Sequence, residues 1–185
     1  MLIPAAIAFT IFIIILTFFT SRTLSPIPYY PSNPKDLRLA TELLEMQNDQ
    51  VVFDLGAGDG IVISQAAYHA YKRGLNTEFY AVEINPILVG ILFLRRLFHP
   101  NRKHIHILWG DLFKMRYSRY IPNARTHVIF YLYISPWMLE RATTIIRNLN
   151  RKIRIVSYFY PIPSLKEFEQ KVEGVHKVYR YEVLP

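Results

Sequence analysis

The segment over residues 51–60, Val-Val-Phe-Asp-Leu-Gly-Ala-Gly-Asp-Gly, places the strongest constraint on the fold of this chain. Its first half is a largely apolar run typical of a buried strand, and a turn with three alternating glycines follows. Because glycine has no Cβ and tolerates positive φ, such a turn brings the backbone close to a ligand. A helical pattern begins at about Ile61, so the segment predicts a strand, a ligand-binding turn and a helix.

The spacing of these glycines distinguishes the turn from a dinucleotide fingerprint, in which the third glycine comes three positions after the second. Here the third glycine is Gly60, two positions after Gly58, and Asp54 lies two positions before Gly56. A turn opened by an acidic residue suits a ligand with an ammonium group better than one with a pyrophosphate. S-adenosyl-L-methionine is such a ligand, and the spacing argues against NAD-linked redox chemistry.

The rest of the chain alternates predicted strands and helices. Strands are expected over residues 51–55, 78–83, 104–109, 126–133 and 152–159, and helices over 34–46, 60–73, 86–98 and 136–149. Helical crossovers of this length imply a mostly parallel sheet. Residues 166–184 contain a predicted tight turn at Val172-Glu-Gly-Val between two antiparallel strands. The expected fold is α/β: a doubly wound, mostly parallel, seven-stranded Rossmann-like sheet with a C-terminal antiparallel hairpin.

The N-terminus is an apolar run, residues 2–19, without a charged side chain. At about 1.5 Å per helical residue, such a run just crosses a hydrocarbon core about 30 Å thick. The first basic residue, Arg22, follows the run, which favours a retained single-pass membrane anchor with the C-terminal body on the cytoplasmic or mitochondrial matrix side. The three expected units are a transmembrane helix over 1–21, a proline-rich spacer over 22–34 and a folded domain over 35–185.

Composition narrows the partners. The chain has no cysteine, and its six histidines form no recognisable ligand array, so no metal site is predicted. Its formal net charge of +8 calls for a polyanionic neighbour, either anionic lipid headgroups or nucleic acid, and the expected anchor argues against RNA. The basic residues considered for contact with lipid are Arg95, Arg96, Arg102, Lys103, Arg141, Arg147, Arg151, Lys152 and Arg154.

Acidic residues stand at the ends of three successive predicted strands. The carboxyl ends of parallel strands meet at one edge of a doubly wound sheet, where ligands bind. Glu83, roughly twenty residues after the glycine turn, is placed to accept hydrogen bonds from both ribose hydroxyls of a nucleoside. Asp111 is expected to accept a hydrogen bond from an adenine amino group, and Leu112 or Phe113 to pack on the adenine ring.

Five motifs accompany the predicted strand ends: Asp54-Leu-Gly-Ala-Gly-Asp-Gly60, Glu83-Ile-Asn-Pro, Gly110-Asp-Leu112, Phe130-Tyr-Leu-Tyr133 and Arg154-Ile-Val-Ser157. With these motifs, nearly all of residues 35–185 resembles the class I S-adenosylmethionine-dependent methyltransferases. Within that class the chain is similar to the small membrane-anchored protein-lysine methyltransferases, whose known members modify the ADP/ATP carrier and the ATP synthase c-ring protein, and to their prokaryotic relatives.

The resemblance implies a seventh strand in the C-terminal hairpin and a set of cofactor contacts. Asp54, Gly56, Gly58 and Glu83 would hold the methionine and ribose parts of the cofactor and Asp111 the adenine, in a predicted site that also includes Gly60 and Leu112. One departure is Ile61, where the family usually has Arg, so whatever that Arg does is not carried over to this chain.

The end of the fourth parallel strand indicates the methyl acceptor. Methyltransferases that act on adenine N6 or glutamine amides usually carry Asn/Asp-Pro-Pro-Tyr/Phe there, whereas this chain has Tyr131-Leu-Tyr133-Ile-Ser-Pro-Trp137. A neutral lysine amine needs only desolvation and alignment, and aromatic rings also hold a methylated ammonium. Tyr131 and Tyr133 are the candidates for lining the acceptor channel, and an ordinary aromatic core strand is the alternative.

The leading interpretation is a membrane-anchored enzyme that transfers methyl groups from S-adenosyl-L-methionine to lysine ε-amines of a membrane protein. One alternative keeps the cofactor and changes the acceptor to RNA or a small lipophilic molecule. Another is a non-catalytic, cofactor-binding membrane assembly factor. Loss of an acid at position 54, 83 or 111 would favour the non-catalytic alternative, and none is lost.

Overall fold

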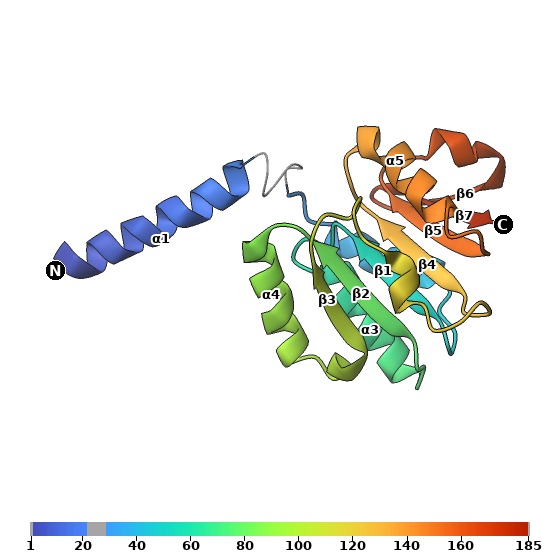
Figure 1. Cartoon of the computed structure of the whole chain (residues 1–185), viewed down its shortest axis with the longest axis horizontal. Helices are drawn as coiled ribbons and strands as arrows, with labels where there is room; N and C mark the ends of the chain where they lie inside the picture. The colour runs from blue at the N-terminus through green and yellow to red at the C-terminus, as the bar shows by residue number, and fades with distance from the viewer. Residues whose placement is uncertain (1, 22–28, 185) are drawn as a thin grey trace.

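The computed structural model describes residues 2–21 and 29–184. Its body is one sheet with the strand order β3-β2-β1-β4-β5-β7-β6 (Figure 1). The strands are β1 (Val51–Leu55), β2 (Glu78–Glu83), β3 (Ile105–Trp109), β4 (Val128–Leu132), β5 (Ile153–Tyr158), β6 (Glu169–Glu173) and β7 (Lys177–Val183). Strands β1 to β5 pair in parallel, and β7 runs antiparallel to β5 and β6. The predicted seven-stranded, mostly parallel sheet with a C-terminal hairpin is confirmed.

Helices follow the strands at the places where the sequence supplies helix starts. The helices of the body are α2 (Leu37–Leu43), α3 (Ile61–Lys72), α4 (Pro86–Leu97) and α5 (Pro136–Arg147), with 3-10 segments η1 (Pro34–Asp36), η2 (Arg102–His104), η3 (Tyr117–Tyr120) and η4 (Pro163–Phe168). Proline occupies the first position of α4 and of α5, where its fixed φ suits a helix and its missing N–H costs nothing. The Asn85 side chain caps α4 by accepting hydrogen bonds from the N–H groups of Ile87 and Leu88. The cap comes two residues after Glu83, so α4 begins close to the end of β2.

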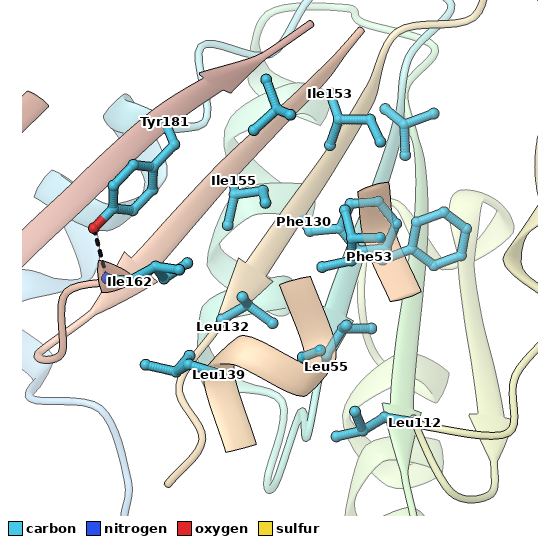
Figure 2. Packing of buried hydrophobic residues seen from close by; sticks show 14 of the residues in the cluster. Phe53, Leu55, Leu112, Phe130, Leu132, Leu139, Ile153, Ile155, Ile162 and Tyr181 are labelled. Atoms are coloured by element: carbon cyan, nitrogen blue, oxygen red, sulfur yellow. Dashed lines mark hydrogen bonds between the residues drawn. The ribbon is translucent and has the colours of Figure 1, made fainter. Parts of the chain in front are cut away.

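Apolar side chains fill both faces of the sheet. All five residues of β1 are buried, as expected for a parallel strand that is covered on both sides. Helix α5 packs on one face, where the rings of Phe53 and Phe130 stack with their centroids 5.1 Å apart (Figure 2). Helices α2 and α3 pack on the opposite face, and Leu92 of α4 joins their core cluster. Polar side chains therefore gather at the carboxyl ends of the parallel strands, where Asp54, Glu83 and Asp111 lie.

Helix α1 (Leu2–Thr20) extends away from the body of the molecule (Figure 1). Among the described residues, no helix combines the length and the apolar character needed to cross a membrane. The transmembrane helix expected over residues 1–21 is therefore not supported, and residue 1 lies outside the described residues.

The expected spacer is partly packed onto the domain. Its residues 22–28 lie outside the described residues. The Oγ atom of Ser32 lies 3.4 Å from the hydroxyl of Tyr131, and the N–H of Asn33 donates to the hydroxyl of Tyr158 at 3.3 Å. The described end of the spacer thus forms part of the folded body.

The fold separates the basic residues that we considered for contact with lipid. Arg95 and Arg96 belong to α4, whereas Arg141 and Arg147 belong to α5, and these two helices pack on opposite faces of the sheet. Arg154 is buried in β5, where it forms an ion pair with Glu182 at 2.5 Å and donates to the carbonyl of Leu44 at 2.7 Å. Arg154 therefore holds the C-terminal hairpin against the body. It is not available for contact with lipid, because its guanidinium is bound to partners inside the protein.

Candidate functional site

A cavity of about 310 Å³ opens at the carboxyl ends of β1, β2, β3 and β4. Strand β1 lies between β2 and β4 in the sheet. The helices after β1 and β4 cover opposite faces, so the connections diverge here and leave a crevice. This is the switch point at which doubly wound sheets bind their ligands.

The glycine turn forms one wall of the cavity. The N–H groups of Gly56 and Ala57 both donate to the carbonyl of Val82, at 2.9 and 3.0 Å, which holds the turn against β2. The backbone has a φ of +76° at Gly56 and +58° at Gly58, values that glycine adopts without strain. A Cβ on Gly58 would lie 2.8 Å from the ring of Tyr29, so this position also needs the bare backbone for close packing.

The third glycine of the turn has a different surrounding. Gly60 does not line the cavity; it precedes α3 with a φ of +76°. A Cβ at this position would lie 2.2 Å from Cδ2 of Leu92 in α4. Gly60 was predicted as part of the cofactor site, and that role stays a prediction; in the structure Gly60 lies where α4 packs against the start of α3.

Glu83 holds the second wall together through its carboxylate. One oxygen accepts from the N–H of Gly58 at 2.8 Å, and the other accepts from the N–H groups of Ile84 and Asn85 at 2.9 and 2.8 Å. A carboxylate offers roughly four acceptor sites, so the oxygen facing Gly58 keeps one site free. One hydroxyl of a bound diol can donate to this free site. The second hydroxyl can donate to the carboxylate only if it replaces one of the backbone N–H groups.

Asp54 is the most unusual ionisable group of the cavity. Its side chain is 3 % exposed, and none of the described residues donates a hydrogen bond to its carboxyl group. Burial, followed by the negative charges of Glu83 and Asp59, raises the pKa of Asp54 to about 8. A buried acid with these neighbours is stabilised by a cation, because the cation offsets both the desolvation and the repulsion. The site therefore favours a positively charged ligand group beside Asp54.

A polar cluster forms the rim of the cavity. The Asp59 carboxylate pairs with the guanidinium of Arg95 at 2.6 Å. Burial of Tyr29 and the nearby negative charge of Asp59 raise the pKa of its phenol to about 12. These contacts hold the segment before the domain across the glycine turn.

The predicted adenine residues line the far side of the cavity. Asp111 accepts a hydrogen bond from the N–H of Phe113 at 2.9 Å, which closes the turn after β3. Leu112 is buried, and its carbonyl accepts a hydrogen bond from the hydroxyl of Tyr117 at 2.5 Å. The guanidinium of Arg141 lies 4.1 Å from the centre of the Phe113 ring. The turn thus presents a carboxylate, an aliphatic side chain and an aromatic ring to the same space.

Tyr131 of β4 and Tyr133, the first residue after β4, both line the cavity and pack in the same core cluster, which confirms that they lie on the same face of the sheet. Tyr131 is 2 % exposed and lies directly beside Asp54 in the register of the sheet. Tyr133 is half-buried, with its ring edge-on to Tyr158 at 4.8 Å. Burial raises the pKa of both phenols, and it raises that of Tyr131 well above the ordinary value for tyrosine. Neither phenol is therefore suited to act as a base near neutral pH.

Several lining residues were not predicted, and two groups of them stand out. Residues 29–32 close one side of the cavity, although the prolines around them predicted only a spacer. The aromatic pair Tyr29-Tyr30 was the available signal, because a solvated linker has no need of two adjacent rings. Met138 and Arg141 of α5 also line the cavity, and no pattern in the sequence marks them.

Comparisons with known proteins agree with this arrangement. No family model matches the chain. A Xenopus laevis protein, the lysine N-methyltransferase of the ATP synthase C subunit, is 27% identical over 158 residues, which are 85% of this chain and 64% of that protein. A "Protein-lysine N-methyltransferase" of Saccharolobus islandicus (strain REY15A) is 33% identical over 66 residues, which are 35% of this chain and 41% of that protein. The chain thus spans less than two thirds of the length of these relatives.

Solved structures show the same fold. An RNA methyltransferase from Salinibacter ruber, in complex with S-adenosyl-L-homocysteine, has a TM-score of 0.66 at 22% identity and covers 84% of this chain and 94% of its own. The precorrin-6y C5,15-methyltransferase from Geobacter metallireducens GS-15 has a TM-score of 0.60 at 16% identity, covering 90% and 92%. The chain has the fold of the class I S-adenosylmethionine-dependent methyltransferases, and its sequence is similar to protein-lysine N-methyltransferases.

Proposed function

We propose that this chain is a methyltransferase that moves methyl groups from S-adenosyl-L-methionine to lysine ε-amines of a membrane protein. The observation that carries the proposal is the buried carboxyl of Asp54, which lies beside the glycine turn without a hydrogen-bond donor among the described residues. A cofactor with an ammonium and a sulfonium group supplies the cation that this acid lacks.

The cavity fits the cofactor in its other parts as well. Its volume of about 310 Å³ lies at the lower end of the range for small-molecule sites. Asp54 would hold the ammonium group, Glu83 the ribose and Asp111 the adenine amino group, with Leu112 against the ring. Gly56 and Gly58 let the backbone approach the ligand. When bound, the cofactor supplies an electrophilic methyl group on its sulfonium sulfur.

The acceptor side of the cavity suits a lysine amine. Tyr131 and Tyr133 provide a partly buried aromatic wall, which desolvates an alkyl ammonium and favours loss of its proton. Because their own pKa values are raised, the phenols stay neutral and contribute ring faces and hydroxyl groups instead of a base. The wall also accommodates a methylated ammonium by cation–π contact. The two named relatives, both protein-lysine methyltransferases, support this acceptor class.

We also propose that the protein works at a membrane, with its catalytic body on the cytoplasmic or mitochondrial matrix side. Apolar side chains of α1 are exposed, among them Phe9 and Phe12 at 65% and 59%. The basic residues Arg22, Lys35 and Arg38 follow this helix in the sequence. Protease added to sealed vesicles should cut the catalytic body only from the cytoplasmic or matrix side. Cleavage from the other side would refute this orientation.

The acceptor is identified by supplying the protein and methyl-labelled cofactor to membranes of the source organism. Label that protease releases and that acid hydrolysis yields as methyl-lysine supports the proposal. Label released by RNase, or extracted with lipid, would assign a different acceptor to the same cofactor site. Glu83→Gln is the matched control, because it removes the carboxylate that would hold the ribose and should strongly reduce labelling when the cofactor is limiting.

A further inference from the structure

Helix α4 is apolar on two sides, and only one of them faces the protein core. Leu88, Val89 and Leu92 are buried against the body. Four large apolar residues are exposed instead, and we call them the α4 outer face: Phe93, Leu94, Leu97 and Phe98. Phe98 is 82% exposed and Leu94 61%. A group of four large apolar side chains on a water-exposed surface is expected to have a partner.

The charge around this face selects the partner. Residues 86–104 contain no acidic residue. Arg95 and Arg96 lie in the last turn of α4, and Arg102 and Lys103 follow in η2. Asp59 is the carboxylate that pairs with Arg95, and it neutralises only part of this charge. An apolar helix face with Arg and Lys in the last turn of the helix and in the segment that follows it is the pattern of a helix that lies in the headgroup region of an anionic bilayer.

The position of α1 points to the same partner. The side-chain amide of Asn85, at the start of α4, donates to the backbone carbonyl of Phe18 near the end of α1 at 3.3 Å. From this contact α1 extends away from the body on the side of α4 (Figure 1), so it leaves the α4 outer face uncovered. The membrane proposed above, which would receive the apolar side chains of α1, therefore lies next to α4.

We propose that the α4 outer face docks into the headgroup region of an anionic phospholipid bilayer. This inference rests on the membrane location proposed above and adds the orientation of the enzyme. Leu88 in the first turn of α4 and Ile84, two residues before α4, line the cavity. Docking of α4 therefore holds the cavity beside the membrane surface. The arrangement selects acceptor lysines that lie close to the headgroups and disfavours lysines on domains far from the bilayer.

The absence of cysteine makes a direct test possible in the full chain. Leu94→Cys is labelled with an environment-sensitive fluorophore, and the protein is reconstituted into vesicles of phosphatidylcholine and phosphatidylglycerol that contain spin-labelled lipid. Phe9→Cys in α1 reports membrane association, and Trp137→Cys reports the opposite side of the body, because Trp137 is 73% exposed on α5. We expect quenching by the spin-labelled lipid at positions 9 and 94 and none at position 137.

The remaining outcomes separate the inference from the membrane location. Quenching at position 9 but not at 94 overturns the docking of α4 and leaves the membrane location intact. No quenching at either position overturns both. A blue-shifted label at position 94 that spin-labelled lipid does not quench assigns the face to a protein, such as a second copy of the chain, and also overturns the inference. In vesicles of phosphatidylcholine alone, quenching at position 94 should fall; equal quenching would overturn the role of the anionic lipid.

Discussion

Substitution of Asp54 by Asn should change how the stability of the cofactor-free protein depends on pH. The pKa of Asp54 is about 8 in the folded protein, against 3.8 as its ordinary value. Between these two values the folded state binds a proton that the unfolded state has released. The free energy of unfolding of the wild-type protein therefore falls as pH rises, by about 1.4 kcal/mol per pH unit from this group alone. Asn does not titrate, so Asp54→Asn removes this slope.

Between pH 5 and pH 7 the free energy of unfolding of the wild type should fall by about 2.7 kcal/mol more than that of Asp54→Asn. The slope is the useful quantity, because the buried Asn amide itself costs about 1–3 kcal/mol at every pH if it finds no partner. Urea unfolding at pH 5, 6, 7 and 8, with both proteins in the same detergent, measures it. Glu167→Gln is the control, because Glu167 is exposed and should leave the slope unchanged.

Two results would refute the reasoning. Parallel stability curves for the wild type and Asp54→Asn would show that the buried acid is ionised throughout the range. Cofactor affinity that is the same in both proteins would show that Asp54 does not face the cationic group. Under the proposed arrangement, the affinity of the wild type for S-adenosyl-L-methionine rises with pH up to about pH 8, as Asp54 ionises. The affinity of the variant stays low and flat.

Three further predictions concern the walls of the cavity and the helix behind it. Glu83→Gln should weaken cofactor binding by about 10- to 100-fold, because a charge-assisted hydrogen bond is worth about 1.5–3 kcal/mol; calorimetric titration of folded protein measures this, and an unchanged Kd would contradict it. Gly60→Ala should destabilise the fold more than Gly74→Ala, because a Cβ at Gly60 meets Leu92 at 2.2 Å whereas Gly74, with a similar positive φ, faces open space. Equal losses in denaturant unfolding would mean that backbone strain alone sets the cost. Tyr133→Phe should lose far less than the roughly 100-fold in kcat expected on removing a general base, and a larger loss would give the phenol a chemical role.

The acids of the site destabilise the empty protein, and this links the predictions for Asp54 and Glu83. The negative charges of Glu83 and Asp59 lie close enough to Asp54 to raise its pKa. Folding tolerates this repulsion because the surrounding sheet is apolar on both faces and packed around Phe53 and Phe130. A cationic ligand stabilises the ionised form of Asp54, so its binding is coupled to loss of the proton that the empty protein keeps below about pH 8.

Much of the fold follows from patterns that lie within short stretches of the sequence. The strands are apolar runs bounded by turn residues, and the helix starts at Pro86 and Pro136 need only local backbone chemistry. The acid at each strand end could be placed beside the glycine turn, because parallel strands bring their carboxyl ends to one edge. Asp54, Glu83 and Asp111 accordingly line one cavity.

Contacts between segments that are far apart in the chain have no such local pattern in the sequence. Gly60 stands in a predicted ligand-binding turn, and the side chain that packs against it is Leu92, which belongs to α4, beyond α3 and β2 in the chain. Tyr29 has the sequence context of a linker, but the fold lays its ring on Gly58. Arg154 has the character of a surface charge, but the antiparallel β7 brings Glu182 beside it. Each of these roles depends on a partner far away in the chain, and only the packing of sheet, helices and hairpin supplies that partner.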